Sequence, residues 1–406
     1  MKLYVQLAWR NLWRNKRRTL IAVSSVFFAV FFSVVMRSMQ KGSYDYMIYT
    51  SVSTFTGYVQ VHGKEFWDKR SLDQSMTIEP SIVQQFREIP HVTAVVPRLE
   101  SFSLISYGSA TKVASVVGID PEHEDQMTNL KSKLTSGTYL ADTSQGILLA
   151  EGLAKVLKVS IGDSIVLYGQ GFQGATAAAL MPVTGIVKFN LPNLNTSLIY
   201  ISLPTAQWLF SAPDRITSLS FMIDNIRHLK SATRNISALT DSRYEVMTWD
   251  KMMPELVQYI EADNSSGIIM LLILYVVIGF GIFATVMMLT NERIREYGVL
   301  ISVGMKKARL IFVTILETIF ISFMGVISGS IASLPIIFYY IKNPIVLTGK
   351  TAEVMLSFGF EPILPFNISA GMFLEQIYTV LIIALFSAIY PYVFIQKLKP
   401  VKALRG

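Results

Sequence analysis

Four long apolar stretches constrain this chain more than any other feature of its sequence. They occupy residues 20–36, 267–289, 310–341 and 377–395. A helix needs about 20 residues to cross a hydrocarbon core of about 30 Å, so each stretch is a candidate membrane span. The third contains Glu317 and Pro335, and we interpret it as one helix with an irregular end. Only 16% of the residues are charged, against roughly 25% in soluble domains, which also indicates a membrane protein.

The positions of the basic residues predict which side of the membrane each connecting segment faces. Lys and Arg are retained in short cytoplasmic loops. Residues 1–18, 290–309 and 396–406 together hold 15 basic and 2 acidic side chains, although the net charge of the chain is only +8. We therefore expect both termini in the cytoplasm and residues 37–265 and 342–376 outside, in the inner membrane of a bacterium. The excess of positive charge therefore indicates which segments face the cytoplasm, and does not indicate a nucleic-acid partner.

These predictions divide the chain into nine segments. They are a cytoplasmic interfacial helix (1–18), a first span (19–38), a periplasmic domain (39–265), a second span (266–290), a cytoplasmic coupling helix (291–309), a third span (310–341), a periplasmic loop (342–376), a fourth span (377–395) and a cytoplasmic tail (396–406). A cleavable signal peptide is the alternative for the first span. The run is followed by Arg37 and Ser38, not by a small-residue cleavage site, so we expect an uncleaved anchor.

The segment between the first two spans is predicted to form an α+β domain of two lobes. Short runs with strand character alternate there with short helical patterns. The expected strands are 92–96, 102–105, 113–117, 147–149, 164–168, 183–187 and 197–201, and the expected helices are 81–88 and 152–157. We assign residues from about 106 to 210 to an inserted lobe and the flanking parts to a lobe near the membrane.

No motif in the chain points to catalysis. Gly169, Gly171 and Gly174 form a G-x-G-x-x-G pattern, but no βαβ unit follows, so a flexible hairpin loop is expected instead of a dinucleotide site. A G-x-x-x-x-G-K-[ST] motif is absent, and ATP hydrolysis would have to come from another subunit. The four histidines are scattered and predict no metal site, and the absence of Cys excludes disulfides and thiol catalysis.

Two features near the predicted cytoplasmic surface carry more information. A carboxylate at position 317, about two turns into an apolar span, needs a partner or a polar cavity, unless it reaches the interface or meets Arg309. The segment 291–310 (NERIREYGVLISVGMKKARL) is short and amphipathic, and Gly298 and Gly304 permit sharp turns and close backbone approach. It is either a helix that docks on a partner or a plain connecting loop.

At this segment the sequence resembles the permease family that includes FtsX, MacB and the Lol lipoprotein-releasing permeases. The similar parts are residues 8–12 (AWRNL) with the basic cluster up to Arg18, residues 292–298 (ERIREYG) with 302–305 (SVGM), and residues 388–391 (AIYP) with 398–405 (LKPVKALR). The resemblance implies a permease dimer, of identical or paralogous subunits, above two separate ATPase subunits that bind ATP and magnesium. The coupling residues implied are Glu292, Arg293, Glu296, Tyr297, Gly298, Val303, Gly304 and Met305.

Within the family, the size of the outer domain and the lack of a fused ATPase are closest to the Lol permeases. This implies mechanical release of lipoproteins toward a periplasmic carrier; a MacB-like efflux permease and an FtsX-like regulator of a cell-wall hydrolase are the alternatives. The loop with Gly169, Gly171, Phe172 and Gly174 occupies the place where Lol permeases capture their carrier. An outward-opening lipid cavity would be lined by Phe28, Phe31, Phe32, Met36, Ile269 and Leu272, for which ordinary packing is the alternative.

Overall fold

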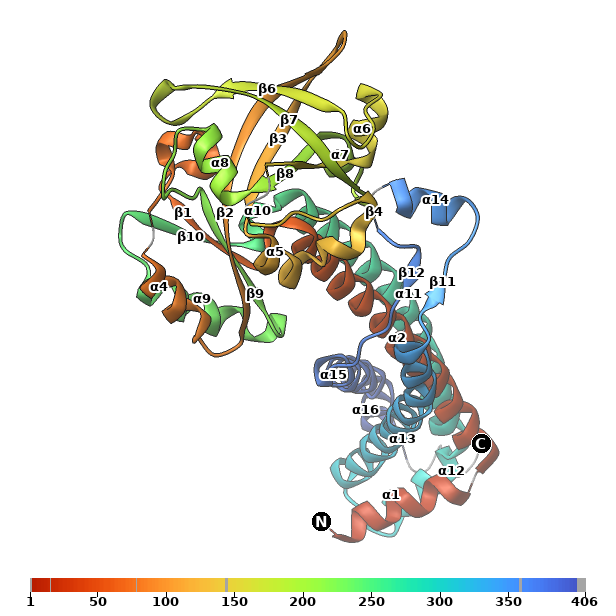
Figure 1. The fold of residues 1–406 in the computed structure, drawn as a ribbon. Coiled ribbons are helices and arrows are strands. Elements are labelled where there is room, and N and C mark those ends of the chain that lie inside the picture. Colours follow the sequence, from red (N-terminus) through yellow and green to blue (C-terminus); the bar gives the residue numbers. More distant parts are fainter. Residues whose placement is uncertain (1, 15, 78, 143–144, 358–359, 400–406) are drawn as a thin grey trace. The chain divides into compact units, whose positions relative to one another are not determined.

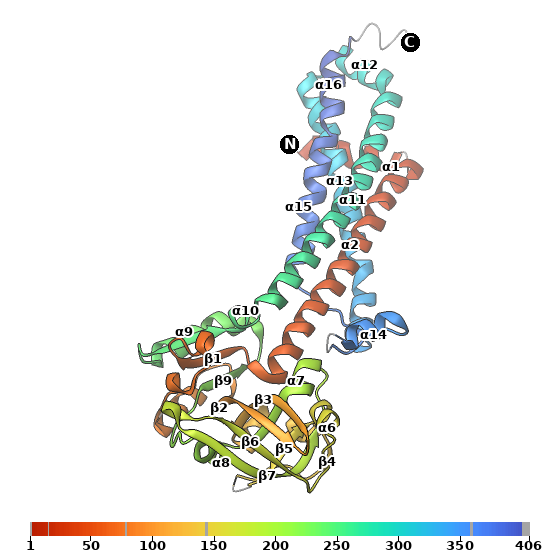
Figure 2. The ribbon, with the colours of Figure 1, turned by 90° about the horizontal axis from the view of Figure 1, so that it is seen from above.

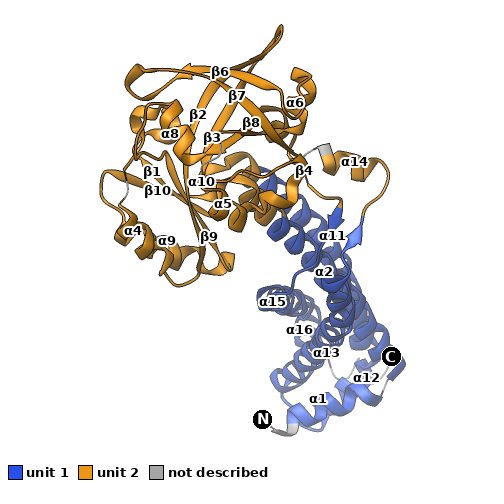
Figure 3. Ribbon diagram, viewed as in Figure 1, with its two compact units in different colours: residues 1–46, 259–346, 363–406 blue, residues 47–258, 347–362 orange. Residues whose placement is uncertain are grey.

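A computed structural model describes residues 2–14, 16–77, 79–142, 145–357 and 360–399. The chain divides into two compact units (Figures 1 and 3). Residues 1–46, 259–346 and 363–406 form the first, which we call the helical unit. Residues 47–258 and 347–362 form the second, which we call the sheet unit. The sequence positions 400–406, which carry most of the predicted C-terminal motif, lie outside the described residues.

The helical unit is built from the apolar stretches of the sequence. Its elements are α1 (Lys2–Arg14), α2 (Lys16–Ser51), α11 (Pro254–Glu292), α12 (Ile294–Ser302), α13 (Lys307–Lys342), the short strands β11 (Ile345–Val346) and β12 (Ile363–Leu364), α15 (Ala370–Ser387) and α16 (Ile389–Lys397). Four of the described helical segments, 16–56, 254–292, 307–342 and 370–397, are long and apolar enough to cross a membrane. Figure 2 shows α2, α11, α13 and α15 running alongside one another.

The helices α2 and α11 are longer than the apolar stretches that predicted them. Hydropathy marks only the part that suits hydrocarbon, whereas both helices continue into polar sequence. Arg37 donates to the Asn264 side chain at 2.8 Å, and the Tyr44 hydroxyl donates to the Asp263 carboxylate at 2.5 Å. These contacts pair the polar ends of the two helices, and polar pairing of this kind leaves no signal in a hydropathy pattern.

The predicted third and fourth spans differ in continuity. Helix α13 is a single helix that includes Pro335, as the sequence predicted. The expected fourth span is instead divided into α15 and α16 at Ala388. Pro391 has no N–H to donate to the carbonyl of residue 387, and its ring would clash there, so a continuous α-helix is interrupted one turn before the proline.

Small residues allow α2 and α13 to pack closely. A Cβ added to Gly325 of α13 would lie 2.5 Å from the Val26 side chain, and one added to Gly329 would lie 2.7 Å from the Phe27 carbonyl. Two glycines four residues apart therefore bring the backbones together, which is a common basis of helix association in membranes. The buried core around this contact contains Val26, Val30, Val34, Ile278, Ile282, Val286 and Val326.

The sheet unit contains one ten-stranded sheet in the order β10-β1-β9-β2-β3-β8-β5-β7-β4, with β6 pairing both β2 and β7. The strands are β1 (Val59–Gly63), β2 (Val92–Tyr107), β3 (Ala110–Ile119), β4 (Leu134–Gly137), β5 (Ile147–Ala150), β6 (Ser164–Gln170), β7 (Thr176–Val187), β8 (Leu198–Ser202), β9 (Ser218–Ile223) and β10 (Tyr244–Thr248). The helices are α3 (Phe66–Lys69), α4 (Pro80–Arg87), α5 (Pro121–Thr128), α6 (Glu151–Leu157), α7 (Pro192–Ser197), α8 (Leu203–Leu209), α9 (Leu229–Leu239), α10 (Trp249–Met252) and α14 (Lys350–Ser357).

The expected division into two lobes is not confirmed, although each expected strand overlaps an observed one; the strand expected over 197–201 begins one residue before β8. The runs 92–96 and 102–105 are parts of the single long strand β2. Strand β2 pairs with β9 along its first part and with β3 and β6 along its second. The sheet therefore passes without interruption through the predicted boundary at residue 106.

A buried ion pair fixes α5 on the sheet. The Arg98 guanidinium of β2 donates to both carboxylate oxygens of Glu124, over 2.8 and 2.7 Å, and both side chains are 0% exposed. The same guanidinium lies 4.7 Å from the centre of the Phe55 ring. Burial alone would lower the pKa of Arg98, but the Glu124 carboxylate reverses this and raises the pKa above its usual value.

Candidate functional site

The predicted coupling segment folds as a helix of nine residues followed by a tight turn. Helix α12 ends at Ser302, where the Gly304 N–H donates to the Ile301 carbonyl and the Met305 N–H donates to the Leu300 carbonyl. This pair of bonds is a Schellman motif, and it needs a left-handed residue that glycine supplies most easily. Gly304 has φ +102°. The expected helix over 291–309 is therefore shorter, with Val303, Gly304 and Met305 in the turn that closes it.

The two glycines of this segment have different positions. Gly304 makes the sharp turn that the sequence suggested, whereas Gly298 lies buried within α12 in ordinary helical conformation. Next to it Tyr297 is buried in an apolar cluster with Leu310 of α13 and Ile395 of α16. Tyr297 and Gly298 thus form the buried face of α12, and Tyr297 packs there against α13 and α16. The opposite face is exposed, and it includes Val299 and Val303, the latter with 83% of its surface accessible.

Glu317 has a partner, and the partner comes from the coupling segment. Arg293, between α11 and α12, donates to Glu317 Oε2 at 2.6 Å, and Asn11 of α1 donates to Oε1 at 2.6 Å. The side chains of Arg293 and Glu317 are 11% and 6% exposed. The alternative partner considered from the sequence, Arg309, has its guanidinium 6.0 Å from the centre of the Tyr4 ring. Glu317 therefore neither reaches the surface alone nor pairs with Arg309.

The pair belongs to a network that involves five helices, α1, α2, α11, α12 and α13. Arg293 also donates to Glu296 of α12 at 3.2 Å, and Glu296 pairs with Arg14 of α1. Arg18 of α2 pairs with Glu292 at the end of α11. We call Asn11, Arg14, Arg18, Glu292, Arg293, Glu296 and Glu317 the coupling network. The sequence had indicated a functional role for Glu292, Arg293, Glu296 and Glu317. It had indicated no such role for Asn11, Arg14 and Arg18, which entered only through the family resemblance and the predicted topology.

The six residues predicted to line a lipid cavity lie on α2 and α11. In α2 the Phe27 ring contacts those of Phe28 and Phe31, and the Phe31 ring contacts that of Phe32, with ring centres 5.1–6.0 Å apart. Leu272 lines a different feature, an apolar groove of about 620 Å³ between α11 and α15. The other groove residues are Tyr275, Val276, Gly279, Phe280, Phe283, Thr379, Ile382, Ile383, Phe386 and Ser387. Met36 and Ile269 are not among them, so Leu272 is the one residue of the predicted cavity that lines this groove.

The glycine-rich loop of the sheet unit is a hairpin turn between β6 and β7. It is held by several bonds: Phe172 N–H donates to the Phe210 carbonyl, Gln173 N–H donates to the Asp73 carboxylate, and the Arg215 guanidinium lies 4.0 Å from the centre of the Phe172 ring. Gly171 is buried, and a Cβ there would lie 2.5 Å from the Phe210 carbonyl oxygen. Gly171 and Phe172 thus attach the loop to the segment around Phe210 and Arg215.

An exposed apolar row lies beside this loop. The sheet register places Val113 of β3, Leu104 of β2 and Tyr168 of β6 side by side on neighbouring strands, and all three are exposed. Together with Phe102, Gly169 and Gly174 they line a shallow groove of about 430 Å³. Adjacent exposed apolar side chains are a common feature of protein–protein contact sites. The sequence missed this row because it arises from three strands.

Comparisons with known proteins agree with the family resemblance. Residues 19–239 match the MacB-like periplasmic core domain, and residues 268–400 match the FtsX-like permease C-terminal region. The chain is 23% identical over 250 residues to the lipoprotein-releasing system transmembrane protein LolC of Xylella fastidiosa (strain 9a5c), a match that covers 60% of each chain.

Two further relatives are of the MacB type. The chain is 22% identical over 326 residues to the macrolide export ATP-binding/permease protein MacB of Psychrobacter cryohalolentis, covering 78% of this chain and 48% of that protein. The periplasmic region of MacB from Actinobacillus actinomycetemcomitans is 20% identical, with a TM-score of 0.35, over 51% of this chain and 94% of that one. The chain thus spans about half to three fifths of the length of the two full-length relatives.

Proposed function

We propose that this chain, which belongs to the MacB-like periplasmic core domain family and carries an FtsX-like permease C-terminal region, is the membrane subunit of an ABC transporter. Its ATP would be hydrolysed by a separate cytoplasmic subunit, and its work would be the release of lipoproteins from the membrane. Both termini and α12 face the cytoplasm in this proposal. The observation that carries it is the coupling network, because that network joins α12 to α1 and to the membrane helix α13.

The network supports a mechanical role for α12. The buried face of α12 is fixed by Tyr297 and by the Arg293–Glu317 pair, whereas Val299 and Val303 are exposed for a partner. Separating two buried charges leaves each without compensation, at a cost of about 3–5 kcal/mol. A push on α12 is therefore transmitted to α13 through Glu317 more readily than it breaks the pair. Closure of two ATPase subunits on ATP would supply that push.

The groove between α11 and α15 supports a lipidic substrate. Its lining is almost entirely apolar, and Phe280 and Phe386 are among its exposed members. An apolar groove on membrane helices can hold acyl chains without the desolvation cost that a polar solute would carry. The row of Val113, Leu104 and Tyr168 would then receive the periplasmic carrier, in place of the glycine loop beside it.

A second candidate is export of amphiphilic small molecules, as in the MacB relatives. The MacB match covers more of this chain than the LolC match does, and an apolar groove suits both kinds of substrate. The two candidates differ in where the substrate goes: a lipoprotein leaves the outer leaflet for a soluble carrier, whereas a toxin leaves the cell.

The test is reconstitution of the chain with its ATPase in liposomes that contain a radiolabelled lipoprotein. Release of label into the soluble fraction on addition of ATP and carrier supports the proposal. ATP-driven loss of a fluorescent macrolide from the same liposomes, without release of lipoprotein, would replace it with the second candidate.

The coupling step is tested by Gly304→Arg, with Gly162→Arg as the matched control. Both glycines have positive φ, +102° and +91°, and a Cβ at either would meet nothing within 4 Å. The backbone strain of the two substitutions is therefore similar, but Gly162 lies in the sheet unit. We expect Gly304→Arg to abolish stimulation of the ATPase and Gly162→Arg to leave it unchanged. Equal stimulation by both variants would refute the role of α12.

A further inference from the structure

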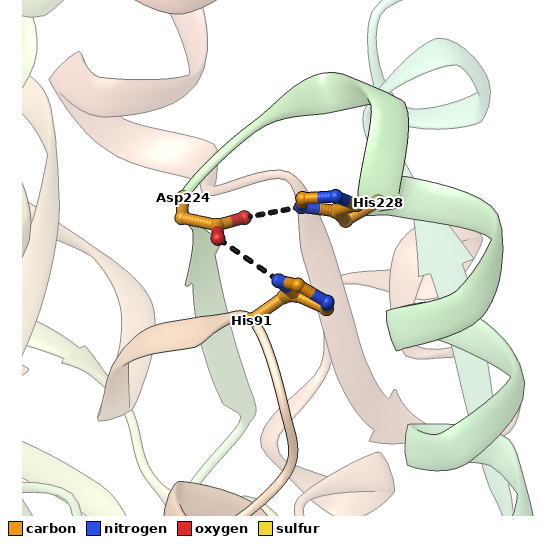
Figure 4. Close-up of side chains that lie close together, drawn as sticks. All are labelled: His91, Asp224 and His228. Atoms are coloured by element: carbon orange, nitrogen blue, oxygen red, sulfur yellow. Dashed lines mark hydrogen bonds and ion pairs between the residues drawn. The ribbon is translucent and has the colours of Figure 1, made fainter.

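Three side chains with metal-binding donor atoms meet at one edge of the sheet unit (Figure 4). His91 lies in the turn before β2, Asp224 directly follows β9, and His228 ends a short 3-10 turn before α9. His91 Nδ1 is 2.9 Å from Asp224 Oδ2, and His228 Nδ1 is 2.8 Å from Asp224 Oδ1. The two imidazole rings stack with their centres 3.6 Å apart. We call these residues the His–Asp–His triad.

The backbone holds the triad in place. Strands β2 and β9 are antiparallel, with Val92 opposite Ile223, and the Asp224 N–H donates to the His91 carbonyl at 3.0 Å. His91 itself has φ +73°, a left-handed conformation that orients its side chain toward Asp224. The Asn225 carbonyl accepts from the His228 N–H at 2.9 Å, which completes the turn that returns His228 to the carboxylate. All three positions are therefore set by main-chain bonds.

The donor set has the chemistry of a transition-metal site. One ligand atom from each residue can be chosen so that all three lie within 4.8 Å of one another. Metal–ligand bonds of about 2.1 Å place two ligand atoms about 3.0 Å apart at a right angle and about 3.4 Å apart in a tetrahedron. The two imidazoles bond different oxygens of the Asp224 carboxylate, at 2.9 and 2.8 Å, and each of these distances is close to the first value.

We propose that His91, Asp224 and His228 bind one divalent transition-metal ion, with zinc as its representative. Two imidazoles and a carboxylate suit zinc, nickel and cobalt, whereas magnesium and calcium prefer oxygen ligands alone. The side chains are 39–43% exposed, so an ion can enter from solvent and water can complete its coordination. The ion would join the start of β2 to the segment that leads into α9.

The triad is assembled from segments that are far apart in the chain. The sequence alone predicted no metal site because His91 lies 133 residues before Asp224. The one local signal is the spacing of Asp224 and His228, four residues apart, which places both at one turn.

The test is zinc binding to the full-length chain, purified in detergent and stripped with a chelator. Binding of ZnCl₂ is measured by titration calorimetry and by metal content after dialysis. The variants are His91→Asn and His228→Gln. Asparagine is chosen at position 91 because it tolerates positive φ better than most residues. The matched control is His123→Gln, since His123 Nδ1 also bonds a carboxylate, Asp120 Oδ2 at 2.7 Å, but without a second histidine on it.

We expect the wild-type chain and His123→Gln to bind one zinc ion per chain with equal affinity. Loss of an outer-shell partner already weakens metal sites by about 10–100-fold, so loss of a ligand should weaken zinc binding at least tenfold in each triad variant. Replacing zinc by cobalt should add a visible absorption band that the variants lack. Wild-type affinity in either correctly folded variant, judged by circular dichroism, or no zinc bound by the wild-type chain, would overturn the proposal.

Discussion

Two buried arginine–glutamate pairs among the described residues are similar in chemistry and different in surroundings. In the sheet unit, Arg98 and Glu124 are both 0% exposed, and their two charges satisfy each other through two direct bonds. In the helical unit, Arg293 and Glu317 are also buried, but Arg293 shares its guanidinium with Glu296, which is 41% exposed and pairs with Arg14. The first pair, which we call the closed pair, makes no ion pair with a further charge among the described residues, whereas the second is linked through Glu296 and Arg14 to exposed charges.

This difference separates a pair that maintains a fold from one that can transmit a change. A closed buried pair has one arrangement, and any displacement exposes two uncompensated charges. A pair within a network is bonded to charges at the surface, so a displacement of α12 there reaches Glu317 through Arg293. In the sheet unit, neither charge of the pair can be removed alone without a loss of stability. In the helical unit, the pair fixes the position of the coupling segment.

The largest expected effect comes from breaking the closed pair. Arg98→Met leaves Glu124 buried without a partner, and we expect a loss of about 3–5 kcal/mol in the free energy of unfolding. Denaturant unfolding of the full-length chain in detergent, followed by tryptophan fluorescence, measures it. The double variant Arg98→Met with Glu124→Leu removes both charges and should recover most of the loss. If the double variant is as unstable as the single one, the effect is not electrostatic.

Glu317→Gln should destabilise the protein less but affect function more. Arg293 keeps Glu296 as an acceptor, so we expect a loss of about 1–3 kcal/mol on unfolding. Transmission from α12 should fail, with a drop of about tenfold or more in ATP-driven transport, equivalent to at least 1.4 kcal/mol. Glu375→Gln is the control: its partner Arg37 is 3.7 Å away and its side chain is 58% exposed. Equal transport by both variants would contradict a coupling role for Glu317.

A smaller effect is expected from Gly304→Ala, which changes the turn and leaves the network intact. The added Cβ meets open space, so the cost is that of a left-handed conformation, about 1–2 kcal/mol. We expect a small decrease in melting temperature and ATPase stimulation within twofold of the wild type. Complete uncoupling by alanine would show that the turn, and not the ion pair, determines the position of α12.

The smallest effect concerns His62 of β1, a buried ionisable group with no opposite charge bonded to it. Its Nδ1–H donates to the Gly63 carbonyl, while Nε2 has no hydrogen-bond partner among the described residues. Burial lowers the pKa of His62, so the neutral form is favoured in the folded state. The unfolded state then binds more protons below about pH 6.5, and stability falls as the pH is lowered through that range.

Melting temperatures of the wild-type chain and His62→Gln between pH 7.5 and 5 measure this dependence. The wild type should lose more stability on acidification than the variant, because only the wild type has the buried imidazole. Equal slopes in the two proteins would mean that His62 does not titrate in this range.

The helices and strands were predicted well where their signals are local. The apolar stretches located the four candidate spans, and strand patterns such as 113–117 and 164–168 fall within β3 and β6. Helix ends were predicted less well, because polar residues such as Tyr44 continue α2 through a contact with α11. The turn at Gly304 that ends α12 was predicted from the sequence. A sharp turn was considered at Gly298 as well, but Gly298 lies within the helix.

The sequence by itself determined which segments are apolar, where the basic residues cluster, and to which family the chain is similar. These properties depend on residues close together in the chain. Only the tertiary structure decided that Arg293 is the partner of Glu317, that Val113, Leu104 and Tyr168 form one row, and that His91 meets Asp224 and His228. Each of these contacts joins distant segments, and a side chain's partner depends on packing that no local pattern encodes.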